Sequence, residues 1–303
     1  MTQEKMPVLL VFFNRPDTTI EVIKAIKKYE PKKLYLASDG PRDHKEDEKD
    51  VVEKARKLVL NEIDWDCEIK TLFREKNVGC GPGVSGAISW FFENEEMGII
   101  LEDDCVPNED FFKFCAEMLK IYKDDKSVMQ INGSNPFGET SSNLFIKTIY
   151  DRIWGWATWA DRWQKYSYTM QQWPEYTQNK KQILKRYYWL EGKIHDTYWK
   201  MGKKKLAERK ETTWDSQWAF CIVMNNGHCI QPNVNLIQNI GFDAGTHFNA
   251  DTISTFETVD FGSLEFPLLF SEQTSKTHEQ KEANDFMRNK TKAFVKKFFK
   301  KFF

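Results

Sequence analysis

The first 135 residues alternate between short apolar runs and longer amphipathic segments, and this alternation constrains the fold more than any other feature. The apolar runs have the length of buried strands and lie at residues 8–13, 34–38, 68–73, 98–101 and 128–131. Between the first two, Ile20, Ile23 and Ile26 repeat at helical spacing. Strands that alternate with helices form a mostly parallel, doubly wound sheet. We therefore predict an α/β fold with a Rossmann-like sheet flanked by helices.

Two of the predicted helices carry start signals. Thr18 and Glu21 have the spacing of a capping box. Asn108 is suited to cap a helix in which Phe111 and Cys115 begin a repeat at core spacing.

Charge, cysteine usage and hydropathy narrow the class of protein. The chain has 44 basic and 45 acidic residues and a net charge of −1, so no global field favours nucleic acid. Its six cysteines show no C-x-x-C spacing, which fits reduced thiols in a cytosol. The N-terminal apolar run is too short for a signal peptide, and no segment approaches the roughly 18 apolar residues that span a bilayer. We expect a soluble, cytoplasmic protein.

The last residues have a different pattern. Residues 294–303 read FVKKFFKKFF, and at about 100° per residue the apolar side chains fill one half of a helix and the lysines the other. A basic helix with an aromatic face suits the inner, anionic surface of a plasma membrane. The alternative is a terminal helix that docks on the protein itself. If a protein truncated after residue 288 sediments with anionic vesicles as well as the full chain does, the first interpretation is wrong.

Three consecutive acids end the fourth apolar run. Glu102, Asp103 and Asp104 stand where a buried strand leaves the sheet, and open α/β sheets bind ligands at that edge. Side chains alternate along a strand, so we expect Glu102 and Asp104 to point one way and Asp103 the other. Such a cluster is typical of a hard-cation site. Alternatively, the acids are solvated and cap the next helix.

Two further strand ends are polar. Arg15 follows the first run and Asp39 the second, and in a parallel sheet both meet the acids at one edge. An arginine, an aspartate and a metal-binding carboxylate together suit a nucleoside diphosphate with its cation. Taken singly, Asp39 is also a turn former before Gly40, and Arg15 a surface charge before Pro16.

A further acid, Asp215, lies between Trp214 and Trp218. Apolar neighbours desolvate a carboxylate, which is how general bases are tuned. A helix N-cap at Asp215 or Ser216 is the competing interpretation. His247 lies in a glycine-rich segment, and it could be a metal or substrate ligand, a phosphate contact or a simple loop residue.

Residues 81–86 match the G-x-G-x-x-G pattern of dinucleotide-binding proteins. The pattern stands several residues past the preceding predicted strand, whereas a dinucleotide loop follows its strand directly. An oxidoreductase is therefore only weakly indicated.

Taken in order, VLLVFFNRPD, SDG, GIILEDDCVPNEDFFKF, IWGWATW and TWDSQWAF resemble the GT-A nucleotide-diphospho-sugar transferases. The similarity is to the inverting N-acetylglucosaminyltransferase I-like branch and its bacterial polysaccharide relatives, and it covers roughly residues 7–250. The resemblance implies a GT-A domain over residues 1–250, with a nucleotide-sugar half (1–135) and an acceptor half (136–250). Residues 251–303 would then be a C-terminal extension that carries the basic helix.

The resemblance also implies roles for individual residues. Asp104 would bind Mn²⁺ or Mg²⁺, and Asp215 would be the catalytic base. The residues implied to contact the nucleotide sugar are Arg15, Asp39, Glu102 and Asp103. Those implied to form the acceptor side are Gly155, Trp156 and Trp214.

The implied activity is transfer of a hexose or N-acetylhexosamine from a nucleotide diphosphate, with UDP favoured, to a glycan or lipid-linked hydroxyl in polysaccharide biosynthesis. Two departures from the family bear on the acceptor. Ser216 replaces a second acid, and the Trp- and Lys-rich residues 163–212 have no clear counterpart. A glycoside hydrolase, which also uses paired carboxylates, and a non-catalytic carbohydrate-binding protein are the competing functions.

Overall fold

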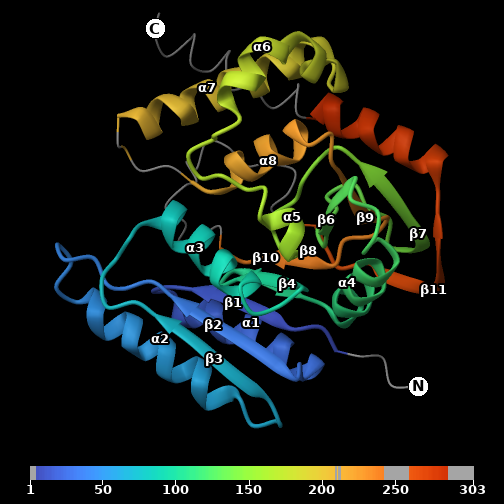
Figure 1. Cartoon of the computed structure of the whole chain (residues 1–303). Helices are drawn as coiled ribbons and strands as arrows, with labels where there is room; N and C mark the ends of the chain where they lie inside the picture. The colour runs from blue at the N-terminus through green and yellow to red at the C-terminus, as the bar shows by residue number, and fades with distance from the viewer. Residues whose placement is uncertain (1–4, 209, 211–212, 242–258, 286–303) are drawn as a thin grey trace, which may run out of the picture.

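The computed structural model describes residues 5–208, 210, 213–241 and 259–285. Within these residues, nine strands form one mixed sheet in the order β11-β7-β9-β6-β8-β4-β1-β2-β3 (Figure 1). The strands are β1 Val8–Phe12, β2 Lys33–Ser38, β3 Glu68–Phe73, β4 Met97–Glu102, β6 Val128–Asn132, β7 Ser141–Thr148, β8 Trp156–Trp159, β9 His228–Pro232 and β11 Ser263–Phe270. A second, two-stranded sheet pairs β5 (Cys105–Pro107) with β10 (Ile237–Asn239).

The first four strands of the large sheet confirm the predicted α/β class. β3, β2, β1 and β4 are parallel neighbours, and β8 runs antiparallel to β4 and to β6. The five strands that the sequence predicts are all present, with ends that differ by one residue at most. Helices cover both faces of the sheet, as expected for a doubly wound arrangement.

The helices are α1 Pro16–Tyr29, α2 Glu48–Glu62, α3 Cys80–Phe92, α4 Glu109–Ile121, α5 Ala160–Trp163, α6 Trp173–Ile183, the 3₁₀ turn η1 Leu184–Arg186, α7 Trp189–Ala207 and α8 Asp215–Met224. Residues 272–285 are also helical. None of the helices in the described part of the chain is long and apolar enough to cross a membrane.

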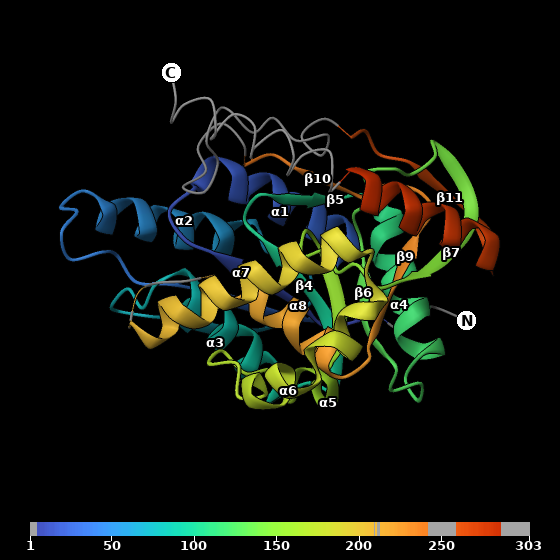
Figure 2. The same ribbon diagram turned by 90° about the horizontal axis from the view of Figure 1, so that it is seen from above.

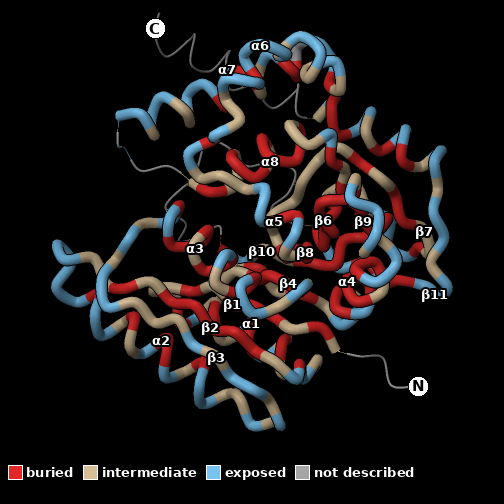
Figure 3. Tube along the Cα trace, in the orientation of Figure 1, coloured by how far each residue is buried: buried red, intermediate tan, exposed pale blue. Residues whose placement is uncertain are grey.

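Alternation along β1 divides the core into two layers. Val8, Leu10 and Phe12 pack with α1, α2 and α4 on one face of the sheet. Leu9 points to the opposite face, where it joins residues of α3 and α8. Figure 3 shows the resulting pattern, in which the central strands are buried and the outer sides of the helices are exposed. A third, smaller core forms between α6, α7 and α8.

The predicted helix starts have different outcomes. Asn108 caps α4 as expected, because its side chain accepts a hydrogen bond from the Phe111 amide at 3.0 Å. The capping box at Thr18 is wrong. α1 begins earlier, at Pro16, whose fixed φ suits the first turn of a helix, and Arg15 precedes it without a side-chain cap.

The glycine pattern at residues 81–86 lies inside α3 and is not a strand-end loop. α3 begins at Cys80, after the six residues 74–79 that follow β3. The G-x-G-x-x-G match therefore does not occupy the place that a dinucleotide loop takes.

Candidate active site

The three acids leave the sheet at the centre of the molecule. β4 lies between β1 and β8 and ends at Glu102, and Asp103 and Asp104 form a turn before β5. Because the extended backbone stops at Glu102, the predicted alternation of these side chains is wrong: Asp103 and Asp104 both approach the same arginine, and Glu102 lines a cavity.

Arg15 is that arginine, and the turn between β1 and α1 holds it over the acids. Its Nη1 lies 2.8 Å from Oδ2 of Asp104 and 3.7 Å from Oδ1 of Asp103. The Phe13 amide donates a further hydrogen bond of 3.2 Å to Asp103. The predicted convergence of the first and fourth strand ends is therefore present in the structure.

The acidic turn places three carboxyl groups beside a single arginine, Arg15. Burial raises the pKa of Asp103 to about 6, although Arg15 acts in the opposite direction. Burial also raises the pKa of Glu102 well above its usual range, and the charges of Asp104 and Asp103 add to this shift. A site with surplus carboxylate charge in a desolvated place favours a cationic ligand.

Asp39 lies at the end of β2, where it faces the start of α3. Its carboxylate accepts hydrogen bonds from the amides of Val78 and Gly40, at 3.1 and 3.0 Å. A side chain on Gly83 would approach Asp39 Oδ2 to 3.2 Å, so a glycine keeps this helix close to the carboxylate. Asp39 is thus at the predicted edge of the sheet but not in the wall of the cavity.

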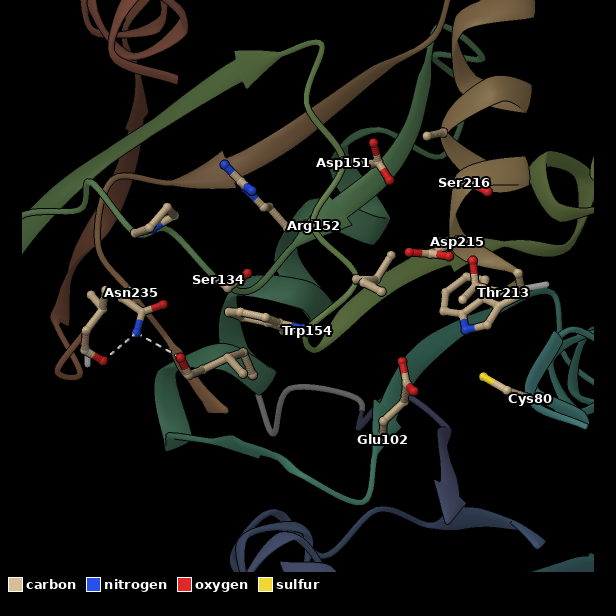
Figure 4. Close-up of a pocket in the computed structure, with 16 residues that line it drawn as sticks. Cys80, Glu102, Ser134, Asp151, Arg152, Trp154, Thr213, Asp215, Ser216 and Asn235 are labelled. Atoms are coloured by element: carbon tan, nitrogen blue, oxygen red, sulfur yellow. Dashed lines mark hydrogen bonds between the residues drawn. The ribbon is translucent and has the colours of Figure 1, made fainter. Parts of the chain in front are cut away.

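A cavity of about 640 Å³ opens beside the acidic turn. Figure 4 shows Glu102 in its lower part and Asp151 and Asp215 near each other above it. Its wall is formed by Cys80, Glu102, Ser134, Pro136, Asp151, Arg152, Ile153, Trp154, Thr213, Trp214, Asp215, Ser216, Ala219, Asn235, Ile237 and Val259. The structure therefore brings three predicted site residues together here: Glu102, Trp214 and Asp215.

Asp215 is the first residue of α8, and its carboxylate is not used to cap that helix. The N-cap position is Trp214, without a side-chain cap. Oδ1 of Asp215 is buried and has no hydrogen-bond partner among the described residues. A buried carboxylate oxygen without a partner is costly, so a ligand hydroxyl that donates a hydrogen bond to Asp215 would be favoured here.

Asp151 and Arg152, in the opposite part of the wall, were not predicted as site residues, and Trp154 entered only within the IWGWATW segment. Asp151, Arg152 and Trp154 follow β7, in a segment whose apolar spacing gives no clear pattern. Burial raises the pKa of Asp151 to about 6, and the nearby charge of Asp215 adds to the shift. Arg152 is ion-paired with Glu282, from the helix at residues 272–285. The only local signal is a pair of charged residues directly before the Trp-rich turn.

Two residues of the predicted acceptor side lie beneath the cavity. Trp156 is fully buried, and its ring stacks on Trp214 with centroids 5.7 Å apart and planes at 18°. Gly155 has φ +61°, and a Cβ there would lie 2.4 Å from Ile237 Cδ1. The two residues shape the wall: Trp156 supports the indole of Trp214, and Gly155 allows the close approach of β10.

The donor set for a metal ion is incomplete within the protein. In the described part of the chain, no group of three or more His, Cys, Asp or Glu side chains is arranged to hold one. The Asp104 carboxylate supplies a hard oxygen beside two further acids, and Mg²⁺-type ions are commonly held by one or two carboxylates together with substrate phosphates. Asp104 could therefore supply one oxygen ligand to such an ion, although Arg15 and Cys105 already donate hydrogen bonds to its carboxylate.

Two predicted features lie outside the described residues. These are His247 and the basic helix at residues 290–303.

No protein-family model matches the chain, and no curated protein matches it either. Solved structures show weak similarity. One is HddC from Yersinia pseudotuberculosis, which is also solved in complex with GMP-PN: it has 6% identity and a TM-score of 0.31, over 52% of this chain and 77% of that chain. A UTP-bound UGPase from Acinetobacter baumannii has 8% identity and a TM-score of 0.34, and the match covers 75% of this chain and 85% of that chain. A UDP-glucose pyrophosphorylase complexed with UDP-glucose has 10% identity and a TM-score of 0.27, over 49% and 64%. Similarities of this size carry no argument about function.

Proposed function

We propose that this chain is an inverting glycosyltransferase that moves a sugar from a nucleotide diphosphate, with UDP favoured, to a hydroxyl of a glycan or lipid-linked acceptor. One observation carries the proposal. The partnerless Oδ1 of Asp215 and the acid Glu102 line the same cavity in the described structure, and Glu102 begins the acidic turn that Arg15 covers.

The donor would bind at the carboxyl end of the parallel strands, where open α/β sheets take their ligands. Arg15 and Asp39 would contact the nucleotide. Glu102 and Asp103 would contact the sugar and the ribose, as the family resemblance implies. Glu102 lines the cavity, and Asp103 lies 3.7 Å from Arg15. Asp104 would hold Mn²⁺ or Mg²⁺, and a bound divalent cation offsets the charge of a departing diphosphate.

Asp215 would act as the general base. The acceptor oxygen forms a bond to the anomeric carbon, the bond from that carbon to the diphosphate breaks, and the hydroxyl proton passes to the Asp215 carboxylate. A single displacement of this kind inverts the anomeric carbon and needs no covalent intermediate. A general base typically contributes about 10²–10⁴-fold to the rate.

The upper wall of the cavity suits the acceptor. The indole of Trp154 lines the cavity and offers flat apolar surface for a sugar ring. Asp151 and Asp215 supply carboxylates for hydroxyl groups, and the guanidinium of Arg152 in this wall is paired with Glu282. Excess negative charge disfavours an anionic group here, so an uncharged sugar would enter this part of the cavity.

A glycoside hydrolase is the second candidate, because Asp151 and Asp215 form a pair of carboxylates in one cavity. A hydrolase would need no nucleotide. The two candidates therefore differ in what stabilises the folded protein, since a ligand that binds only the folded state raises the Tm by mass action.

The test is a thermal-shift screen of UDP-, GDP-, dTDP- and CMP-sugars with Mn²⁺, with NAD and free sugars as controls. The proposal expects one nucleotide sugar to raise the Tm, and the Asp104→Ala variant to lose that shift. Stabilisation by free sugars alone would favour the hydrolase or a carbohydrate-binding protein. Stabilisation by NAD would favour the oxidoreductase.

A further inference from the structure

The α6–α7 hairpin concentrates positive charge in a chain that is nearly neutral. Residues 173–207 contain nine Lys and Arg against three Asp and Glu, which gives +6, whereas the whole chain carries −1. Two of the three acids, Glu191 and Asp196, are buried. The surface of this hairpin is therefore strongly basic.

One side of α7 combines this charge with exposed apolar groups. We name Trp189, Lys193, Lys200, Met201 and Lys204 the basic aromatic face. At about 100° per residue they fall within an arc of about 120°. The side chains of Trp189 and Met201 are 73% and 53% exposed, and the Lys193 ammonium lies 3.7 Å from the centroid of the Trp189 ring.

The opposite side of α7 anchors the helix to the protein. Trp199 is buried between Tyr176 of α6 and Phe220 of α8. Figure 2 shows α7 crossing over α8, and Figure 3 shows exposed residues along α7. The basic aromatic face is thus held outward by a packed core.

We propose that the basic aromatic face of α7 docks on an anionic membrane surface. Lysines are attracted to anionic headgroups, and an exposed indole and thioether insert at the boundary between headgroups and acyl chains. Nucleic acid would also attract the lysines, but it has no apolar layer in which the exposed Met201 side chain could be buried. The inference does not depend on the proposed function, and it concerns a different segment from residues 290–303.

The test is cosedimentation of the full chain with vesicles of phosphatidylcholine, alone or mixed with phosphatidylglycerol, at roughly 0.1 M salt. We expect binding to the mixed vesicles only. The double variant Lys193→Glu, Lys204→Glu should weaken it by at least about tenfold, since each lysine near the surface contributes about one kcal/mol. Lys200 stays unchanged because it pairs with Asp196 at 2.8 Å.

The matched control is Lys49→Glu, Lys54→Glu on α2, which makes the same change of charge on exposed residues of a distant helix. It should leave binding unchanged, and Trp189→Ala should weaken it. The inference is overturned if the wild-type protein binds neither or both vesicles, or if the α7 and α2 variants behave alike. Binding of heparin or single-stranded DNA that is as tight as vesicle binding and insensitive to Trp189→Ala would also overturn it.

Discussion

Among single residues, Asp215 matters most for the proposed transfer reaction. Its buried Oδ1 lacks a partner in the described structure, so we assign it the acceptor proton. Asp215→Asn keeps the shape and removes the basic oxygen. We expect kcat to fall by about 10²–10⁴-fold with little change in donor affinity, measured by steady-state kinetics and calorimetry. Near-wild-type turnover would show that another group is the base.

Asp151 has a different expected effect, because we place it against the acceptor. Asp151→Asn should raise the KM for the acceptor by roughly 10- to 100-fold, the range expected when a hydrogen bond to a charged group is lost. Hydrolysis of the donor in the absence of acceptor should stay unchanged. Equal losses of transfer and of donor hydrolysis would contradict an acceptor role.

His278 predicts how stability depends on pH. Its buried ring lies 2.9 Å from both Gln231 and Asn135, and burial lowers its pKa to about 3, with Arg152 and Lys281 adding to the shift. As pH falls, the His278 ring takes up a proton near pH 6.5 in the unfolded state but not in the folded state. The contribution of the neutral, buried ring to the free energy of unfolding is therefore complete above pH 6.5 and is lost as pH falls toward 3.

Urea unfolding at pH 7.5 and 5.0 measures this effect. Between pH 7.5 and 5.0, the free energy of unfolding should fall by about 2 kcal/mol more in the wild type than in the His278→Gln variant. The comparison with the variant is needed because the raised pKa of Asp103 and of Asp151 changes stability with the opposite sign. Identical pH dependence of the two proteins would contradict the assignment.

Among the helices and strands, the sequence predicted those whose formation depends on local hydrophobic pattern and helix capping. The first four strands come from apolar runs of strand length. Asn108 is a residue type that favours the N-cap of a helix, and its side chain accepts a hydrogen bond from the Phe111 amide. Tertiary context decided the rest. Glu102 ends β4 at a turn, which sends Asp103 and Asp104 to Arg15, and no pattern in the sequence marks that turn.

The strands beyond the first half were harder to predict. β11 reads SLEFPLLF, and its proline and exposed apolar residues do not alternate as in a half-buried strand. It is nonetheless part of the large sheet, parallel to β7. Asp151 was missed for a related reason: it follows β7, a strand that the sequence did not predict, so its place at the cavity could not be inferred.

Gly155 tests the turn between the cavity wall and β8. Gly155→Ala places a side chain at φ +61° and against Ile237, and we expect it to destabilise the fold by about 1–3 kcal/mol. Gly202→Ala in α7 is the control, because its nearest neighbour would be 3.9 Å away and alanine favours helix, so it should be neutral or stabilising. Chemical denaturation distinguishes them, and equal effects would contradict the strained turn.

At the scale of the whole molecule, one sheet connects the two predicted halves. β8, from the predicted acceptor half, lies between β4 and β6, and the cavity takes Glu102 from the first half and Asp215 from the second. Arg15 and the acids after β4 converged because the parallel strands β1 and β4 present their carboxyl ends at one edge, which is a property of topology that the sequence already indicates. Asp215 reaches the cavity from the start of α8 and not from a strand end. The upper wall depends on long-range packing, such as the pairing of Arg152 with Glu282, which sequence spacing does not reveal.

The proposed donor site can be tested with a crystal structure of the protein with Mn²⁺ and the nucleotide identified in the thermal-shift screen, with anomalous data for the metal. We expect a manganese peak at the Asp104 carboxylate, a diphosphate next to it under Arg15, and the sugar-bearing end directed toward Glu102 and Asp215. Nucleotide bound at any other part of the fold, with neither metal nor phosphate at the end of β4, would contradict it.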